Sequence, residues 1–335
     1  MNDRPSRNFG LDIVRATEAA ALAAGRWMGL GQPGEADFKA TEAMRAALNT
    51  IDMEGFIAMG PEHRPHMCDF LEPAQPVGTG DGPQLDIVID PIDGPDLVAL
   101  GHPGAISVMA GAPRGAFWSP APAVYLEKIV VDMDVADVLV AECMDAPAAW
   151  TLALVARAKR KPVSDLTVFL LDRPRHVDLI DEIRTAGAHV MLRNEGEVVG
   201  TLLAGMPDGG VDVLMGVGGI SEGLIAACAV KAMGGAMLGR LAPQSDEERA
   251  AVRAAGLDTR QILVTDELVS GNAVFFAATG ITDGPLLAGV QYDAECARSN
   301  SLIMRGETRT RRTILAEHFF DNGNGVQRPT NSDLR

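Results

Sequence analysis

The sequence has few aromatic residues, few basic residues and no long apolar run. Phe, Trp and Tyr make up only 4% of the 335 residues, so we expect a core built mainly from aliphatic side chains and Met. The formal net charge of -16 argues against a nucleic-acid partner, because binding to phosphate backbones needs clustered Lys and Arg. No stretch of 18 uncharged apolar residues occurs, and the N-terminal run MNDRPSRNFG contains no apolar segment of the kind that signal peptides have, so we expect neither a membrane span nor export.

Cysteine is also scarce, and its spacing excludes some kinds of site. The four cysteines lie far apart and form no Cys-x-x-Cys pair, at Cys68, Cys143, Cys228 and Cys296. This pattern favours reduced, mostly buried thiols in a cytoplasmic protein. The length suffices for one large domain or two closely packed lobes, and no internal repeat divides it.

The pattern of predicted helices and strands changes near residue 145. Before it, the patterns predict two helices (16–28 and 37–49) and then short strands (56–59, 85–89 and 106–110). After it, helices and strands alternate, which predicts βαβ units and a mostly parallel sheet. The helices are expected at 146–160, 177–186, 198–205 and 221–233, and the strands at 166–171, 189–192 and 211–215. We therefore expect lobes at 1–145 and 146–320, with a loose polar tail at 321–335.

The sharpest local motif is Asp-Pro-Ile-Asp-Gly at residues 90–94, directly after the apolar strand LDIVI. A turn there would place Asp90 and Asp93 together at a sheet edge, where carboxylate oxygens suit Mg²⁺ or Mn²⁺. The plain alternative is a structural turn, since Asp, Pro and Gly are all turn residues.

A second motif is VDVLMGVGGISE at residues 211–222, a strand followed by glycines and a helix start. Backbone N–H groups at such a start bind phosphate. The motif also resembles a poor dinucleotide fingerprint, but its third glycine is out of register and Glu222 would repel a pyrophosphate. Glu222 fits a metal ligand better, or a residue that complements the helix dipole.

A third motif places two arginines after the strand at 166–171, in the run DRPRH. Arg173 and Arg175 would clamp a phosphate at the carboxyl end of a strand, where α/β proteins bind ligands. The alternative is a solvated basic turn.

In order and spacing, the chain resembles the class II fructose-1,6-bisphosphatases from near residue 8 to near residue 320. The matching blocks are VRATEAAALAAGRWMG, AMRAALN, VGTG, DIVIDPIDG, APAVYLEK, LTVFLLDRPRH, MPDGGVDVLMGVGGISEG, VFFAATGITDGPLL and MRGETRTRR. The resemblance implies a layered α-β-α-β-α sugar-phosphatase fold related to the inositol monophosphatases. It also implies a cytoplasmic homodimer or homotetramer that uses Mg²⁺ or Mn²⁺ to remove the 1-phosphate of fructose 1,6-bisphosphate, or that of sedoheptulose 1,7-bisphosphate.

The resemblance also assigns roles by position. Metal ligands are implied at Asp37, Asp90, Asp93 and Glu222, and substrate contacts at Tyr125, Arg173, Arg175, Glu195, Glu197 and Gly219. Catalytic roles fall to Asp93 and, if it shifts into the place of a family glutamate, to Glu62.

The departures from the family fall on the chemistry. Pro61 stands where the family has a metal-ligand Glu, Pro95 where it has the Thr that positions the attacking water, and Asp96 where it has Arg. Proline has no hydroxyl and no N–H, and losing a proton-handling group costs about 10² to 10⁴ in rate. One alternative is thus an impaired paralogue that binds sugar phosphate without turnover. Another is a rebuilt Zn²⁺ or Mn²⁺ site in the altered loop, from Glu62, His63, His66 and Asp69.

Overall fold

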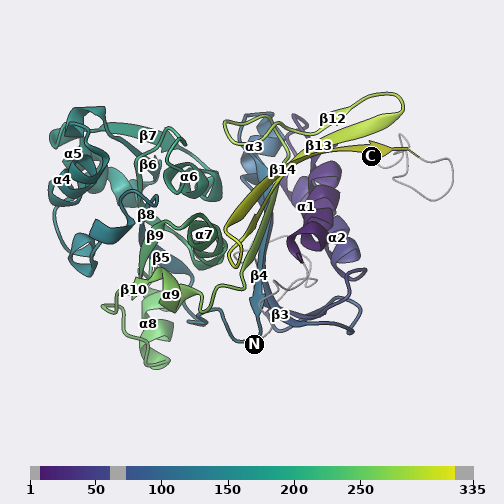
Figure 1. Ribbon diagram of the computed structural model, residues 1–335, viewed down its shortest axis with the longest axis horizontal. Helices are drawn as coiled ribbons and strands as arrows, with labels where there is room; N and C mark the ends of the chain where they lie inside the picture. The colour runs from purple at the N-terminus through teal and green to yellow at the C-terminus, as the bar shows by residue number, and fades with distance from the viewer. Residues whose placement is uncertain (1–7, 61–72, 321–335) are drawn as a thin grey trace.

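The computed structural model describes residues 8–60 and 73–320, which form five layers. Figure 1 shows α4 and α5, one sheet, α6 and α7, a second sheet, and α1 and α2 in succession across the molecule. The helices are α1 Gly10–Gly25, α2 Pro33–Leu48, α3 Pro95–Leu100, α4 Ala148–Lys159, α5 Val177–Thr185, α6 Glu197–Ala204, α7 Ile220–Met233, α8 Asp246–Ala254 and α9 Thr265–Leu268. The predicted layered α/β fold is confirmed.

The larger sheet has the strand order β12-β13-β11-β4-β3-β1-β2, with β14 on the other side of β13. Its strands are β1 Glu54–Met59, β2 Pro76–Val77, β3 Gln84–Asp93, β4 Ile106–Pro113, β11 Phe275–Gly280, β12 Gln291–Tyr292, β13 Cys296–Arg305 and β14 Thr310–Phe319. Only β1 and β3 run parallel among these pairs.

The smaller sheet has the order β10-β9-β5-β8-β6-β7. Its strands are β5 Tyr125–Val131, β6 Thr167–Leu171, β7 His189–Arg193, β8 Val213–Gly219, β9 Ala236–Leu241 and β10 Leu263–Val264. The strands β7, β6 and β8 are parallel, as predicted, but β5 pairs antiparallel with both β8 and β9. The prediction of a mostly parallel sheet is therefore wrong for the pairs that involve β5, β9 and β10. Strand β5 enters this sheet from the preceding segment and runs antiparallel to β8 and β9.

Alternating side chains bury both faces of the larger sheet. On β3, Val88 joins the core between the two sheets, whereas Ile87 and Ile89 join the core beneath α1 and α2. A third core packs α4 and α5 onto the outer face of the smaller sheet. Helix α7 lies between the sheets and is buried on nearly every side, which explains why its sequence is apolar all round.

The chain crosses between the sheets twice. Strand β5 lies before residue 145 but belongs to the smaller sheet, and β11–β14 lie after it but complete the larger one. A lobe boundary near residue 145 therefore stays a prediction about folding units and does not divide the two sheets. The described cysteines, Cys143, Cys228 and Cys296, are free and buried. Within the described ranges, no helix has the length and apolarity that crossing a bilayer requires.

Candidate active site

A bulge at the end of β3 determines how the two aspartates of the first motif lie. Asp90 pairs with Val108 on β4 and Asp93 with Ile106, so the pairing register shifts between them. The predicted tight turn is wrong, since β3 continues through Asp93. Residues three apart on a regular strand point to opposite faces, and an extra residue in a bulge cancels that offset. The irregularity thus allows both carboxylates to face the same site.

Asp93 lies in a concentration of negative charge. Its side chain is buried, and its Oδ2 accepts a hydrogen bond from the Val198 N–H at 3.0 Å. Burial raises its pKa well above the usual range, and the carboxylates of Asp90, Glu222 and Glu197 raise it further. Repulsion among buried carboxylates is what a bound cation relieves, so the chemistry of these donors fits a divalent metal.

Glu197, at the start of α6, forms an ion pair with the buried ammonium group of Lys128. The ammonium of Lys128 on β5 is fully buried and lies 2.8 Å from the Glu197 Oε1. A Cβ on Gly218 would lie 1.7 Å from the Glu197 Oε2, so only glycine admits this carboxylate. Burial raises the pKa of Glu197, and Lys128 opposes that rise. Sequence reasoning missed Lys128, whose only signal was a lysine within the apolar strand YLEKIVV.

The basic side of the site follows β6. Arg173 and Arg175 line the same cavity of about 240 Å³ as Asp93, Glu197 and Glu222. The cavity is also lined by Gly94, Pro95, Tyr125, Leu171, Glu195, Gly196, Gly218 and Gly219. The structure therefore brings the predicted substrate contacts together with two of the predicted metal ligands, on elements drawn from both sheets.

A buried histidine holds Arg175 in place. The Nδ1 of His176 lies 2.7 Å from the Leu171 carbonyl oxygen, and its Nε2 accepts the Val217 N–H at 2.8 Å. These partners require the neutral tautomer with its proton on Nδ1, and burial lowers the pKa of His176. The Val217 carbonyl in turn accepts two bonds from Arg175, from Nε at 3.1 Å and Nη2 at 2.8 Å. Nothing in the charged run RPRH distinguished this role.

The rim of the cavity contains the changed motif. Pro95 is the first residue of α3, and Gly94 before it has a left-handed φ of 96°. The Asp96 N–H donates to the Glu195 Oε2 at 3.0 Å. On the opposite wall, the Arg175 guanidinium lies 5.3 Å from the centre of the Tyr125 ring, within range of a cation–π contact. The rim thus carries the Glu195 carboxylate, and it has Pro95 at the position where the family resemblance implies a threonine hydroxyl.

Three predicted residues are not in the lining of this cavity. Asp90 lies beside it, where its carboxylate raises the pKa of Asp93. Asp37 is buried on α2, and neither the cavity lining nor the carboxylates that raise the Asp93 pKa include it. Glu62 lies outside the described residues, as do the loop residues Pro61, His63, His66 and Asp69. No three His, Cys, Asp or Glu side chains in 8–60 and 73–320 lie together in a way that would hold a metal ion. The described donors fit a metal chemically without forming a complete ligand set.

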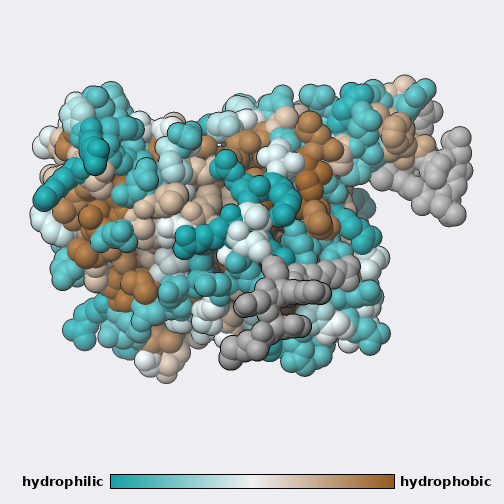
Figure 2. Space-filling view, in the orientation of Figure 1, coloured by the Kyte–Doolittle hydropathy of each residue, from teal (hydrophilic) through white to brown (hydrophobic). Residues whose placement is uncertain are grey.

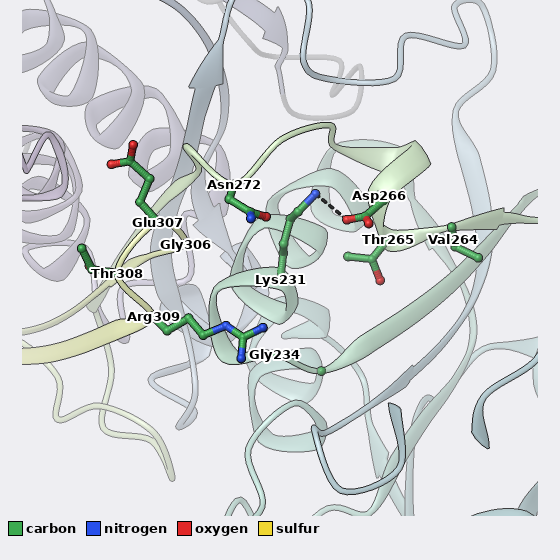
Figure 3. A pocket seen from close by; sticks show the side chains of 11 residues that line it. Lys231, Gly234, Val264, Thr265, Asp266, Asn272, Gly306, Glu307, Thr308 and Arg309 are labelled. Carbon is green, nitrogen blue, oxygen red and sulfur yellow. Dashed lines mark ion pairs between the residues drawn. The ribbon is translucent and has the colours of Figure 1, made fainter. Parts of the chain in front are cut away.

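A larger cavity of about 540 Å³ lies elsewhere, between the end of α7 and the turn that joins β13 to β14. Figure 3 shows Lys231 pointing toward Asp266 across it, with an ion pair of 2.6 Å. Glu307 pairs with Arg305. Because both acids are already paired with cations, the smaller cavity, with its clustered carboxylates, is the better candidate for catalysis.

An acidic cluster facing two arginines, in a five-layered α/β fold, defines a class of phosphate-handling sugar phosphatases. The sequence matches the family described as "Bacterial fructose-1,6-bisphosphatase, glpX-encoded" over residues 7–318. It is 37% identical over 330 residues to "Fructose-1,6-bisphosphatase class 2" of Haemophilus influenzae, covering 95% of this chain and 98% of that protein. It is 36% identical over 328 residues to "Fructose-1,6-bisphosphatase 1 class 2" of Escherichia coli K12, covering 94% and 96%. The chain belongs to this bacterial fructose-1,6-bisphosphatase family, which confirms the resemblance and implies a divalent metal requirement.

Proposed function

We propose that this protein hydrolyses the 1-phosphate of fructose 1,6-bisphosphate, with sedoheptulose 1,7-bisphosphate as a further substrate, in carbohydrate metabolism and gluconeogenesis. The observation that carries the proposal is the single cavity in which Asp93 and Glu222 face Arg173 and Arg175. A phosphorylated sugar suits this arrangement, because arginine forks bind phosphate oxygens while carboxylates accept hydrogen bonds from hydroxyl groups. Family membership supports the same reaction.

In the proposed site, one wall of the cavity binds the metal and the other binds the phosphate. Asp90, Asp93 and Glu222 would hold Mg²⁺ or Mn²⁺, which when bound neutralises charge on the phosphate and activates water. Arg175, fixed through the Val217 carbonyl, would bind the phosphate together with Arg173. Backbone N–H groups at the start of α7, next to Gly219, would add to that site.

The sugar would lie between the remaining side chains of the cavity. Tyr125 would pack against it, and Glu195 and Glu197 would accept hydrogen bonds from its hydroxyl groups. The ion pair with Lys128 opposes the rise that burial causes in the pKa of Glu197, and it fixes the orientation of this carboxyl group. We place the protein in the cytoplasm, as an oligomer of identical chains.

One observation favours the second candidate, a paralogue that binds sugar phosphate without turnover. Pro95 has neither a hydroxyl nor an N–H to direct water, and the neighbouring Asp96 N–H is already bonded to Glu195. In this candidate the basic wall and Tyr125 still bind the ligand, and the hydrolytic step is slow.

Phosphate release and ligand binding, measured on the same preparation, separate the two. With Mg²⁺ or Mn²⁺, we expect release from fructose 1,6-bisphosphate, and a loss of binding of about 10-fold or more in Arg175→Gln. Arg184→Gln, on the exposed surface of α5, is the matched control and should bind normally. Binding without release, with release restored in Pro95→Thr, would favour the paralogue. A protein that neither binds nor hydrolyses the sugar would overturn both.

A further inference from the structure

Glu248, near the start of α8, bonds to its own helix through one carboxylate oxygen. Ser245 precedes the helix, and its Oγ accepts the Glu248 N–H at 3.0 Å. The Glu248 Oε2 in turn accepts the Gln244 N–H at 2.8 Å. This reciprocal arrangement resembles a capping box, in which the third residue of a helix binds a backbone N–H just before the helix. One oxygen of this carboxylate therefore stabilises the start of α8.

The other oxygen of Glu248 binds a distant part of the chain. Its Oε1 accepts the Val124 N–H at 2.7 Å and the Tyr125 N–H at 3.1 Å, from residues that lie 124 and 123 positions earlier. Tyr125 is the first residue of β5. Consecutive N–H groups of a regular strand point to opposite sides, so their convergence on one oxygen fixes a turn of the backbone where β5 begins. Hydrogen bonds to a carboxylate are about twice as strong as neutral ones, so this contact holds the backbone firmly.

Helix α8 lies at the surface of the molecule, outside the active-site cavity. Figure 1 places it at the lower left, and Figure 2 shows hydrophilic residues beside weakly hydrophobic ones on the surface there, as expected of a helix rich in charged residues and alanine. Val252 is its buried residue, whereas Glu248 is half-buried. The described residues that line the active-site cavity do not include Glu248. A change at this residue therefore reaches the ligand through the segment that it holds.

The segment that Glu248 holds belongs to the active site. The Val124 carbonyl oxygen accepts the N–H of Ile220, the first residue of α7, at 2.9 Å. The Tyr125 carbonyl oxygen accepts the Ala242 N–H, just after β9, at 3.0 Å. The Tyr125 side chain lines the cavity, and the centre of its ring lies 5.3 Å from the guanidinium carbon of Arg175. The backbone that carries this ring is thus held by α7, by the end of β9 and by the carboxylate from α8.

We propose that Glu248 is a positioning residue for the sugar-phosphate site. By binding the Val124 and Tyr125 N–H groups, it fixes the Tyr125 ring in the cavity and against Arg175. This inference rests on the proposed function, in which Tyr125 packs against the sugar. A carboxylate suits the task because it has two oxygens, one for its own helix and one for β5. A ring that is already in place binds the ligand more tightly, since less order has to be gained on binding.

Two substitutions of Glu248 separate the roles of its two oxygens. In Glu248→Ala the Val124 and Tyr125 N–H groups turn to water, so Kd for fructose 6-phosphate, the product of the proposed reaction, should rise about 5-fold or more. Glutamine keeps one oxygen, and two N–H groups on β5 attract it more strongly than the single one at Gln244. Glu248→Gln should therefore bind within about 2-fold of the wild type. Titration calorimetry with Mg²⁺ present measures both values without turnover.

The kinetic constants give a second measurement of the same effect. In Glu248→Ala, KM for fructose 1,6-bisphosphate should rise by the same factor as Kd, about 5-fold or more. The value of kcat should change by less than about 2-fold, because the carboxylates that would hold the metal lie on β3 and α7, to which Glu248 makes no direct hydrogen bond in the described part of the chain. A fall in kcat at constant KM would overturn the proposal.

Tyr125→Ala distinguishes a failure of this inference from a failure of the proposed function. We expect Kd for fructose 6-phosphate to rise about 5-fold or more, and Glu248→Ala should add little in the Tyr125→Ala background, because both changes remove the same contact. If Tyr125→Ala binds normally, the sugar contact of the proposed function is wrong and the inference is overturned with it. If Tyr125→Ala binds weakly while Glu248→Ala binds like the wild type, or if the two effects add, only the role of Glu248 is overturned.

Two further variants of α8 control for a general loss of structure. Glu247→Gln changes the exposed residue beside Glu248 and should bind normally. Val252→Ala shortens the buried side chain of α8, so it should lower Tm while Kd stays within about 2-fold of the wild type. Equal weakening of binding in Val252→Ala and Glu248→Ala would assign the effect to lost packing, and equal weakening in Glu248→Gln would exclude Oε1 as the group that matters. Either result would overturn the proposal.

Discussion

The ammonium of Lys128 is the counter-charge for Glu197, and its removal tests how the site is stabilised. In Lys128→Met the methylene stem stays packed, but Glu197 remains buried beside Asp93 and Glu222 without its partner. Breaking a buried pair from one side costs about 3 to 5 kcal/mol, far more than losing an exposed pair. We expect the free energy of unfolding to fall by that amount at pH 7.

The loss should depend on pH, and its sign follows from the carboxyl group. Without Lys128, the folded-state pKa of Glu197 rises further above its unfolded value. The destabilisation is therefore small at acidic pH, where Glu197 is protonated in both states, and grows as pH rises through the folded-state pKa. The double variant Lys128→Met, Glu197→Gln should recover most of the loss, since replacing both members of a buried pair is often nearly neutral.

Urea unfolding at several pH values measures these effects, with Lys161→Met as the control. Lys161 is 48% exposed, and its partner Asp212 keeps a second cation, Lys159, at 3.1 Å. The control should lose no more than about 1 kcal/mol. If Lys128→Met lost no more than the control, or if its loss did not change with pH, the idea of an uncompensated buried carboxylate would be refuted.

Three further predictions concern the same cavity. Because burial and neighbouring carboxylates raise the Asp93 pKa, the metal-free protein should lose stability as pH rises through that folded-state pKa; Asp93→Asn should abolish this loss in urea unfolding and also abolish phosphate release. Gly218→Ala should displace Glu197 and destabilise the protein by about 1 to 3 kcal/mol in thermal unfolding, whereas Gly34→Ala, with open space around it, should not. His176→Phe keeps an aromatic ring but loses both hydrogen bonds, so KM for fructose 1,6-bisphosphate should rise about 10-fold, and the protein should lose about 1 to 3 kcal/mol of stability because the Leu171 carbonyl and the Val217 N–H lose their partner. An unchanged pH profile, Tm or KM, respectively, would contradict each one.

Local patterns predicted the helices and the central strands closely. The helix expected at 37–49 is α2, and the strands expected at 85–89 and 166–171 lie within or overlap β3 and β6. These segments have a strong apolar period and clear end signals, so local sequence suffices. The late strands were recognised only as blocks of a family resemblance. In β14, charged and apolar residues alternate without a buried face, so local sequence gives little signal there.

Several features of the site depend on contacts between distant parts of the chain, which local sequence patterns do not reveal. The bulge between Asp90 and Asp93 exists because β4 pairs out of register there, which no pattern within DPIDG reveals. The ion pair of Lys128 with Glu197 joins β5 to α6 across about 70 positions of chain, and the hydrogen bonds of His176 join two strand ends. Most of the site residues predicted by position line the cavity where their elements pack together, whereas Asp37 and Asp90 are not in its lining and Glu62 lies outside the described residues.

The path of the chain through the two sheets has a consequence during synthesis on the ribosome. One edge of β4 pairs with β11, which follows it by more than 160 positions in the chain, so this edge stays unpaired until β11 has been synthesised. Until residues 275–305 have emerged, β4 offers an unpaired apolar edge to any other nascent chain. If translation stops while the strands of the smaller sheet are being synthesised, the released product lacks half of the strands of the larger sheet. Such fragments should aggregate or engage chaperones instead of accumulating as a stable domain.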